Sequence, residues 1–173
     1  MHMDLVKKLA QKKSAVVKAW FENLVNTYPI DTAQFLKNQS DPFANPVGQN
    51  SLQSLKDVFD LLLGGFELKA AQPLIDPIIR MRAIQNFTPS QAVRFIFDLK
   101  KIIHDITAVD AKDAQGQKDM HLLDNRIDRL GLLGFDIYMS CREKIYDLKA
   151  NEMRDRTYSA FARAGLIKES DDS

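Results

Sequence analysis

Three arginines and two hydroxyl side chains gather around a helix start in the middle of this sequence. They are Arg80, Arg82, Thr88, Ser90 and Arg94. Thr88 can cap the helix through its side-chain oxygen, and Pro89 suits the first helical position, where its missing N–H costs nothing. Because helix N-termini attract anions and arginines strengthen that attraction, these five residues are candidates for an anion or ligand site. The competing interpretation, which the sequence favours, pairs Arg80 with Asp76 one turn earlier and leaves the others in water or in salt bridges.

The remaining reactive side chains form no recognisable catalytic or metal-binding pattern. Of the histidines His2, His104 and His121, neither of the last two follows a glutamate by three residues, as a carboxylate-bridged di-iron site requires. One cysteine with scattered histidines does not supply a zinc site, and no phosphate-binding loop of the Walker type is present. Cys141 stands among apolar residues, which favours a packed core thiol. We therefore predict no catalytic residue, no metal and no enzyme activity.

A haem group would need an axial ligand that projects from a helix into an apolar pocket. His104 lies between charged neighbours, Lys101 and Asp105, on the polar side of its expected helix. His121 stands at the start of the last helix, where we expect it to be exposed. The sequence therefore predicts no haem and no other cofactor.

Composition limits the class of protein. The 173 residues, 45% of them hydrophobic, are enough for one core and one domain. A net charge of +1 gives no basic footprint for nucleic acid, and the lysines of the first 28 residues are read as a solvated helix face rather than a membrane contact. No apolar run approaches the ~20 residues that span a bilayer. A single cysteine fits a reducing compartment, so we expect a cytoplasmic protein.

The hydrophobic pattern predicts an all-α chain of six or seven helices. After Pro89, apolar residues recur every three or four positions as far as Ile106, and no period-two strand pattern is present. The expected helices span 4–27, 32–38, 46–63 and 74–85, then from Pro89 to a polar loop at 110–116, then from Lys118 to a stop at Gly165. Pro73 is expected to open the fourth helix, and Phe43 to anchor the loop at 40–48 in the core. One helical domain, 1–165, and a polar tail, 166–173, follow from this division.

The last helix predicts self-association. It is apolar on more than one side between 122 and 138, and a helix that is apolar nearly all round must be buried nearly all round. Gly131 and Gly134 lie mid-helix, where each costs about 1 kcal/mol against alanine, which suggests that another backbone passes close by. We expect a homodimer whose interface candidates are Ile127, Leu130, Gly131, Gly134, Ile137 and Tyr138. The alternative is that this helix is buried centrally within one chain.

Three stretches of the sequence resemble a known family. They are SDPFANPVG (40–48), DPIIRMRAIQNFTPSQAVRFIFDLKK (76–101) and RIDRLGLLGFDIYMSCREKIYDLKANEMRDR (126–156). Together they resemble the N-terminal domain of RsbRD-type proteins, the RsbT co-antagonists of bacterial stress signalling, over about 20–161. The resemblance implies a helical sensory module of the globin-like or helical-bundle type. It also implies that two copies associate and that the terminal helix passes a signal to a STAS domain.

The sequence departs from that family pattern at its end, because only about ten residues follow Ala162, fewer than an output domain needs. The family offers no catalytic or ligand residue to transfer. Our leading hypothesis is a non-enzymatic stress-signalling module without a STAS domain, which acts as a homodimer and binds a protein partner. The alternative is a sensor that holds an apolar, anionic or haem ligand in a pocket among the helices.

Overall fold

Seven α-helices make up the described part of the chain. The computed structural model describes residues 3–38, 41, 43–85, 87–107 and 114–166. Within these residues there is no β-strand, which confirms the predicted all-α fold. The helices are α1 (Met3–Gln11), α2 (Lys13–Val25), α3 (Ile30–Asn38), α4 (Pro46–Leu63), α5 (Leu68–Ile84), α6 (Pro89–Thr107) and α7 (Ala114–Arg163).

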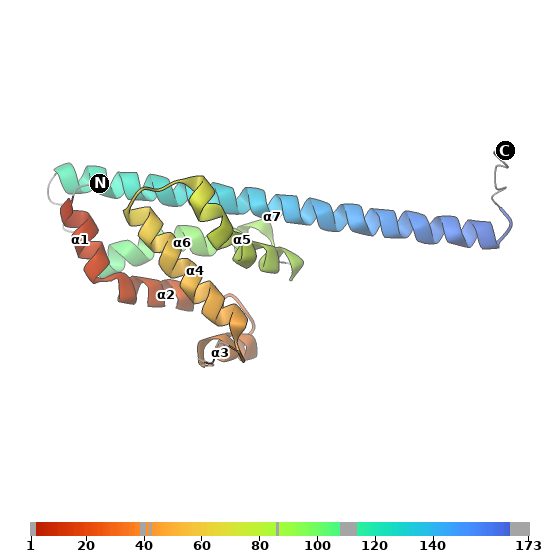
Figure 1. Cartoon of the computed structure of the whole chain (residues 1–173), viewed down its shortest axis with the longest axis horizontal. Coiled ribbons are helices and arrows are strands. Elements are labelled where there is room, and N and C mark those ends of the chain that lie inside the picture. Colours follow the sequence, from red (N-terminus) through yellow and green to blue (C-terminus); the bar gives the residue numbers. More distant parts are fainter. Residues whose placement is uncertain (1–2, 39–40, 42, 86, 108–113, 167–173) are drawn as a thin grey trace.

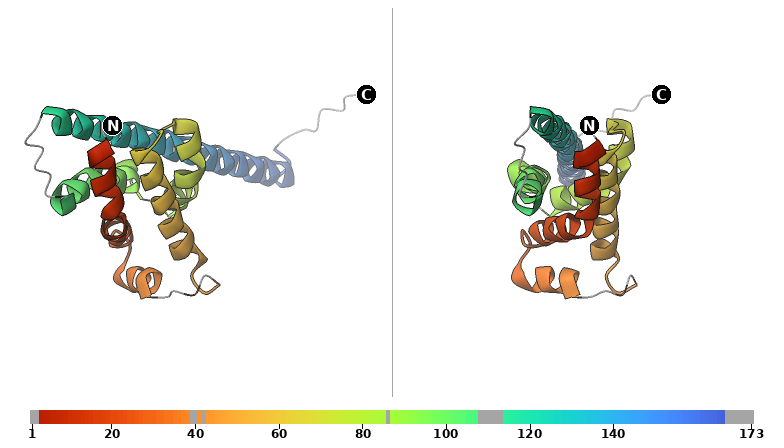
Figure 2. Two further views of the ribbon diagram at one scale, coloured as in Figure 1. Left: turned by 60° about the vertical axis from the view of Figure 1, so that its left-hand side comes forward. Right: turned by 90° about the vertical axis from the view of Figure 1, so that its left-hand side faces the viewer.

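The long helix α7 supports the rest of the domain. Figure 1 shows the other six helices gathered along its N-terminal half, while its C-terminal half extends beyond them. α5 and α6 pack directly against α7, α2 packs on α6, and α4 packs on α5. α3 packs against α2 and α4 of the outer layer and lies at the edge of the domain in both views of Figure 2. The domain therefore has two helical layers on α7, and half of α7 has no layer over it.

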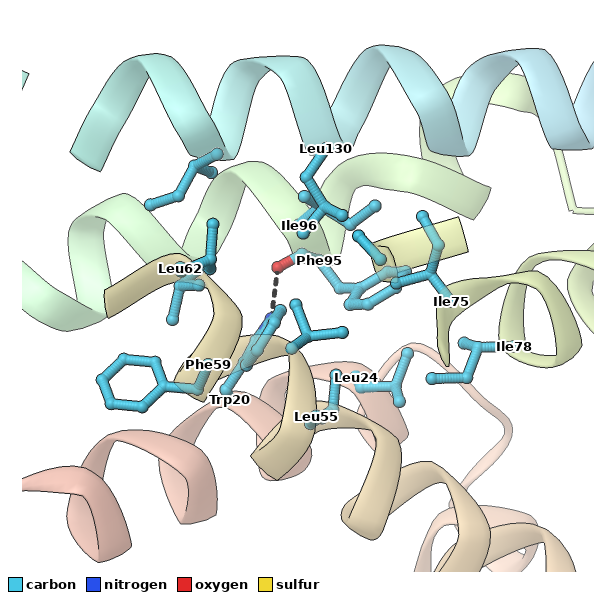
Figure 3. Packing of buried hydrophobic residues seen from close by; sticks show 14 of the residues in the cluster. Trp20, Leu24, Leu55, Phe59, Leu62, Ile75, Ile78, Phe95, Ile96 and Leu130 are labelled. Carbon is cyan, nitrogen blue, oxygen red and sulfur yellow. Dashed lines mark hydrogen bonds between the residues drawn. The ribbon is translucent and has the colours of Figure 1, made fainter. Parts of the chain in front are cut away.

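Trp20 is the centre of the hydrophobic core (Figure 3). Its indole is fully buried on α2, and its Nε1–H donates to the main-chain oxygen of Phe95 on α6 at 2.8 Å. The ring of Phe95 lies 6.3 Å from the indole, centroid to centroid. Side chains from α4, α5, α6 and α7 close around this pair, among them Phe59, Leu62, Ile75, Ile96 and Leu130. One cluster thus joins both layers to α7.

The two predicted Xaa-Pro helix starts are confirmed. The Asn45 carboxamide caps α4, because its Oδ1 accepts from Gly48 N–H at 2.9 Å and its Nδ2 donates to the Leu36 carbonyl at 3.0 Å. Thr88 caps α6 through a longer bond, 3.3 Å, from Gln91 N–H to its hydroxyl. Side-chain oxygens at these positions satisfy N–H groups that have no partner inside the helix.

The predicted first helix, 4–27, is wrong in one respect, because it breaks at Lys12 into α1 and α2. The apolar stripe continues from Leu9 to Val16 across the break, so the spacing of hydrophobic residues does not record the change in direction. Lys12 has φ −98° and ψ 4°, and its Nζ donates to the Ile106 carbonyl at 2.7 Å. The break thus coincides with a contact between Lys12 and Ile106, which are 94 residues apart in the chain.

The prediction that Pro73 opens α5 is wrong, because Pro73 lies inside this helix. The helix begins five residues earlier at Leu68, and it contains Pro77 as well. Each proline removes one main-chain hydrogen bond. Both prolines are exposed, so the carbonyls that lose a partner lie on the face that water can reach.

Phe43 does not anchor its loop in the core, since its side chain is 96% exposed. Asn45 holds the loop instead, and it is buried through its two hydrogen bonds to Leu36 and Gly48. At the other end of the chain, α7 begins at Ala114, inside the predicted loop 110–116. It ends before Gly165, whose φ of 69° is the left-handed conformation expected of a glycine stop. Residues 110–113 and 167–173 lie outside the described residues.

Gly134 is expected to be intolerant of larger side chains for a reason within one protomer. A Cβ atom there would lie 2.9 Å from Ile96 Cδ1 and 3.5 Å from Ile79 Cδ1. Gly134→Leu should lower the free energy of unfolding by about 1–3 kcal/mol, the cost of overpacking a core. Gly65→Ala is the matched control, because nothing lies within 4 Å of an added Cβ at that position. Equal urea midpoints for the two variants would show that α7 does not pack this closely on α5 and α6.

Candidate interaction surface on the C-terminal helix

The N-terminal half of α7 is fixed to the domain by side chains that reach main-chain oxygens. Arg126 Nη1 donates to the carbonyls of Leu62, at 2.5 Å, and Gly64, at 2.9 Å, and so holds the end of α4. The Tyr138 hydroxyl donates to the carbonyl of Phe87, just before α6. One turn later, Arg142 Nη1 donates to the Ala83 carbonyl at 3.0 Å, at the end of α5. α7 is therefore attached to the turn between α5 and α6 at the point where it leaves the domain.

Arg82 lies beneath this turn and is fully buried. Its Nη2 donates to Thr27 Oγ1 at 2.8 Å and to the Gln91 carbonyl at 3.0 Å. The guanidinium carbon lies 4.3 Å from the ring centroid of Phe87 and 5.3 Å from that of Tyr28, so aromatic faces rather than a salt bridge surround the cation.

Burial lowers the pKa of Arg82 from its usual value, although an arginine stays protonated near neutral pH. Its Nε and Nη1 have no hydrogen-bond partner within the described part of the chain. A buried positive charge whose hydrogen bonds are incomplete thus lies beneath the turn that holds α7.

The five predicted anion candidates do not form one site. Arg80 Nε lies 2.6 Å from Asp76 and Arg94 Nε lies 3.5 Å from Asp98, each pair one turn apart on its own helix. The hydroxyls of Thr88 and Ser90 are 3.2 Å apart at the exposed start of α6. The interpretation as salt bridges is confirmed for Arg80 and Arg94.

For Arg82 the same interpretation is wrong, because this residue is neither in water nor in a salt bridge. A signal was present in the sequence. Arg82 continues the buried series Ile75, Ile78 and Ile79 at helical spacing, so it falls on the core face of α5.

The six residues predicted for the dimer interface form the core face of α7 within one protomer. They are Ile127, Leu130, Gly131, Gly134, Ile137 and Tyr138, and all are buried against the rest of the domain. The close helix approach that the glycines predicted is present, but it is made to α6, where a Cβ on Gly131 would overlap the ring of Phe97. The alternative of a helix buried centrally within one chain therefore describes the N-terminal half of α7, and these residues present no surface to a second copy.

The C-terminal half of α7 is different, because no residue from Arg142 to Leu166 is buried. Large apolar side chains are nevertheless frequent on it: Tyr146 is 56% exposed, Met153 68% and Phe161 47%. Three more exposed apolar side chains lie on the same side of α7 in the half that packs on the domain, namely Leu132, Phe135 and Met139. Exposed apolar residues at this density are typical of surfaces that take part in association.

These side chains belong to one continuous row, here called the outer stripe. It consists of Leu132, Phe135, Met139, Arg142, Tyr146, Ala150, Met153, Thr157 and Phe161. Successive members are three or four residues apart, which is one side of a helix. Phe135, Tyr146 and Thr157 are equivalent positions in an 11-residue repeat, the spacing of helices that associate with little or right-handed supercoiling. Arg142 donates to the Ala83 carbonyl of the same protomer, while the other members of the outer stripe lie on a different side of α7 from the core face.

The histidines and the cysteine of the described residues give little support to a catalytic or metal-binding site. His104 is exposed, as predicted, with its Nε2 3.8 Å from Asp124, and His121 is exposed as well. Cys141 is buried, which confirms the packed thiol. Among the described residues, no three His, Cys, Asp or Glu side chains are grouped so that they could hold a metal ion. No helix in the described part combines the length and apolar character needed to cross a membrane.

Comparison with known proteins now identifies the family. Residues 14–153 match the family described as the RsbT co-antagonist protein rsbRD N-terminal domain. This chain is a member of that family. The match to the RsbRD N-terminal domain begins in α2 and ends at Met153, so it includes a large part of the outer stripe. The resemblance drawn from the three sequence stretches is therefore confirmed.

This RsbRD N-terminal domain also has a relative in another organism. An uncharacterized protein of Archaeoglobus fulgidus is 26% identical over 149 residues, which cover 81% of this chain and 83% of that protein. No solved structure matches the chain. The family points to a regulatory domain in stress-response signalling.

Proposed function

We propose that this RsbRD N-terminal domain is a non-enzymatic, cytoplasmic regulatory module that forms a homodimer and acts on a protein partner. The observation that carries the proposal is the outer stripe of α7. The stripe spans about 30 residues, which is about 45 Å of helix. A helix that exposes an apolar row of this length gains stability by pairing it with another helix. A second copy offers an identical row, and symmetric pairs of this kind are the commonest oligomers.

The attachment of α7 to the α5–α6 turn supports a route for the signal. Tyr138 and Arg142 tie α7 to the main chain of this turn immediately before the helix leaves the domain. A change in the turn therefore acts on the paired C-terminal halves, where the partner would bind. Family membership supports the same direction of signalling, since the members are named as co-antagonists of another protein.

Sedimentation equilibrium at tens of micromolar tests the dimer. We expect twice the protomer mass of 19.7 kDa for the wild type. Tyr146→Lys combined with Met153→Lys should raise the dissociation constant by more than about a hundredfold, because burial of both apolar side chains is lost in each copy. The far-UV circular dichroism spectrum should be unchanged, because neither residue is part of the core.

Leu148→Lys is the matched control. Leu148 is 70% exposed on the same half of α7 but is not in the outer stripe, so this variant should remain a dimer. A wild-type mass of 19.7 kDa under these conditions would contradict the proposal. Dissociation by Leu148→Lys to the same extent as by the double variant would contradict the assignment of the surface.

A second candidate function, a sensor for a small molecule, is favoured by one observation, a groove on the opposite side of the domain. Neither His104 nor His121 lines this groove, so the groove gives no support to a haem ligand.

A further inference from the structure

A groove of about 850 Å³ lies where the ends of α1 and α3 meet the sides of α2 and α4. Figure 2 shows α3 and the adjoining ends of α2 and α4 at the edge of the domain that lies away from α7. The volume falls within the ~300–1,000 Å³ of ordinary small-molecule sites. Because four helices bound the groove, it suits a compact ligand better than a continuous helix of another protein.

The floor of the groove is apolar. Val17 and Phe21 contribute from α2 and are buried, and Leu52 contributes from α4 and is partly buried. A hydrocarbon chain laid on this floor would be removed from water, which is favourable.

The rim of the groove is strongly basic. Lys13, Lys18, Lys37 and Lys56 line it, against a single acidic residue, Glu22. Lys13 is engaged by Asp60 at 2.6 Å, and Lys37 donates to the Asn26 carboxamide at 2.6 Å. Within the described residues, Lys18 and Lys56 have no recorded ion pair, so two ammonium groups from facing helices remain to bind an anion.

From the apolar floor and the basic rim we infer that this groove binds a free long-chain carboxylate. The lysine ammonium groups of Lys18 and Lys56 hold the carboxylate, and Val17, Phe21 and Leu52 contact the chain. Glu22 disfavours a second negative charge, so a ligand with one carboxylate fits better than a dianion. The inference goes beyond the proposed dimer and does not depend on it, since the groove and the outer stripe share no residue.

Titration calorimetry with dodecanoate below its micelle concentration tests the inference on the full chain. We expect saturable binding of one dodecanoate per protomer, with a dissociation constant on the order of 10 µM, as burial of about eight methylene groups gives. Dodecanol, which lacks the charge, should bind about five- to tenfold more weakly. Raising the salt concentration should weaken the binding of dodecanoate more than the binding of dodecanol.

Lys18→Gln combined with Lys56→Gln should weaken dodecanoate binding about five- to tenfold, the effect of two partly solvated ion pairs. Lys118→Gln combined with Lys149→Gln is the control, because it removes the same charge from exposed positions on α7 and should change affinity less than twofold. Leu52→Gln changes the floor independently of the rim and should weaken the binding of both dodecanoate and dodecanol.

Four results would overturn the inference: no saturable binding of dodecanoate, equal affinity for dodecanol, equal affinity in the Lys18/Lys56 double variant, or binding only to vesicles of anionic phospholipid. Sedimentation of the same samples reports the oligomeric state separately, so failure of the groove and failure of the dimer are distinguishable.

Discussion

Replacing Trp20 with alanine is expected to lower the free energy of unfolding by about 3–5 kcal/mol, the usual cost of removing a large buried aromatic side chain. Trp20 is fully buried at the centre of the core that joins α2 to α6. Its removal leaves a cavity between the two layers, and the Phe95 carbonyl loses its side-chain donor at 2.8 Å. Urea unfolding followed by circular dichroism measures the change, since the variant has no other tryptophan to report by fluorescence.

Trp20→Phe separates the packing from the hydrogen bond. Phenylalanine keeps most of the buried ring but has no N–H, so we expect a smaller loss of about 1–2 kcal/mol. A loss below about 1 kcal/mol for Trp20→Ala would show that the core is not centred on this residue.

Leu99→Ala should lower the free energy of unfolding by about 2–5 kcal/mol, the range for truncation of a buried leucine. Leu99 lies on the core face of α6, between Phe95 and Ile103, and it is fully buried. The matched control is Ile84→Ala at the end of α5, where the side chain is 65% exposed and a change of less than about 0.5 kcal/mol is expected. Equal midpoints for the two variants would mean that α6 presents the opposite face to the core.

Helix starts and the core face of α6 could be predicted because they depend on neighbours in the sequence. Asn45 before Pro46 and Thr88 before Pro89 supply a side-chain oxygen and a residue without an N–H at the positions that need them. These are local interactions, and they form in the structure as the residue types indicate. The spacing of Phe95, Leu99 and Ile103 likewise records which side of one helix is apolar.

The break at Lys12 and the burial of Arg82 could not be predicted from neighbouring residues in the sequence. Lys12 lies between two apolar segments whose spacing is continuous, and its Nζ is bound to Ile106, 94 residues away. Arg82 continues the spacing of Ile75, but whether a charged residue there reaches solvent depends on the rings of Tyr28 and Phe87 closing over it.

For the two faces of α7, too, the sequence predicted one part and helix packing decided the other. Apolar residues around α7 and glycines at 131 and 134 indicated that something covers more than one side of the helix. The sequence could not say that the glycines face α5 and α6 of the same protomer while the outer stripe stays open. Both faces carry large apolar side chains, and the position of the other helices decides which of them is buried.

The all-α class, the capped helix starts and the long final helix could be predicted from the sequence, because propensity, capping and periodicity act within a few residues. The RsbRD family followed from the resemblance of three stretches. The tertiary structure alone decided which face of α7 is core, where Arg82 lies, and that lysines from α2, α3 and α4 meet over one apolar floor. These features bring together residues that are far apart in the chain, and their distances are set by how the helices pack rather than by any local preference.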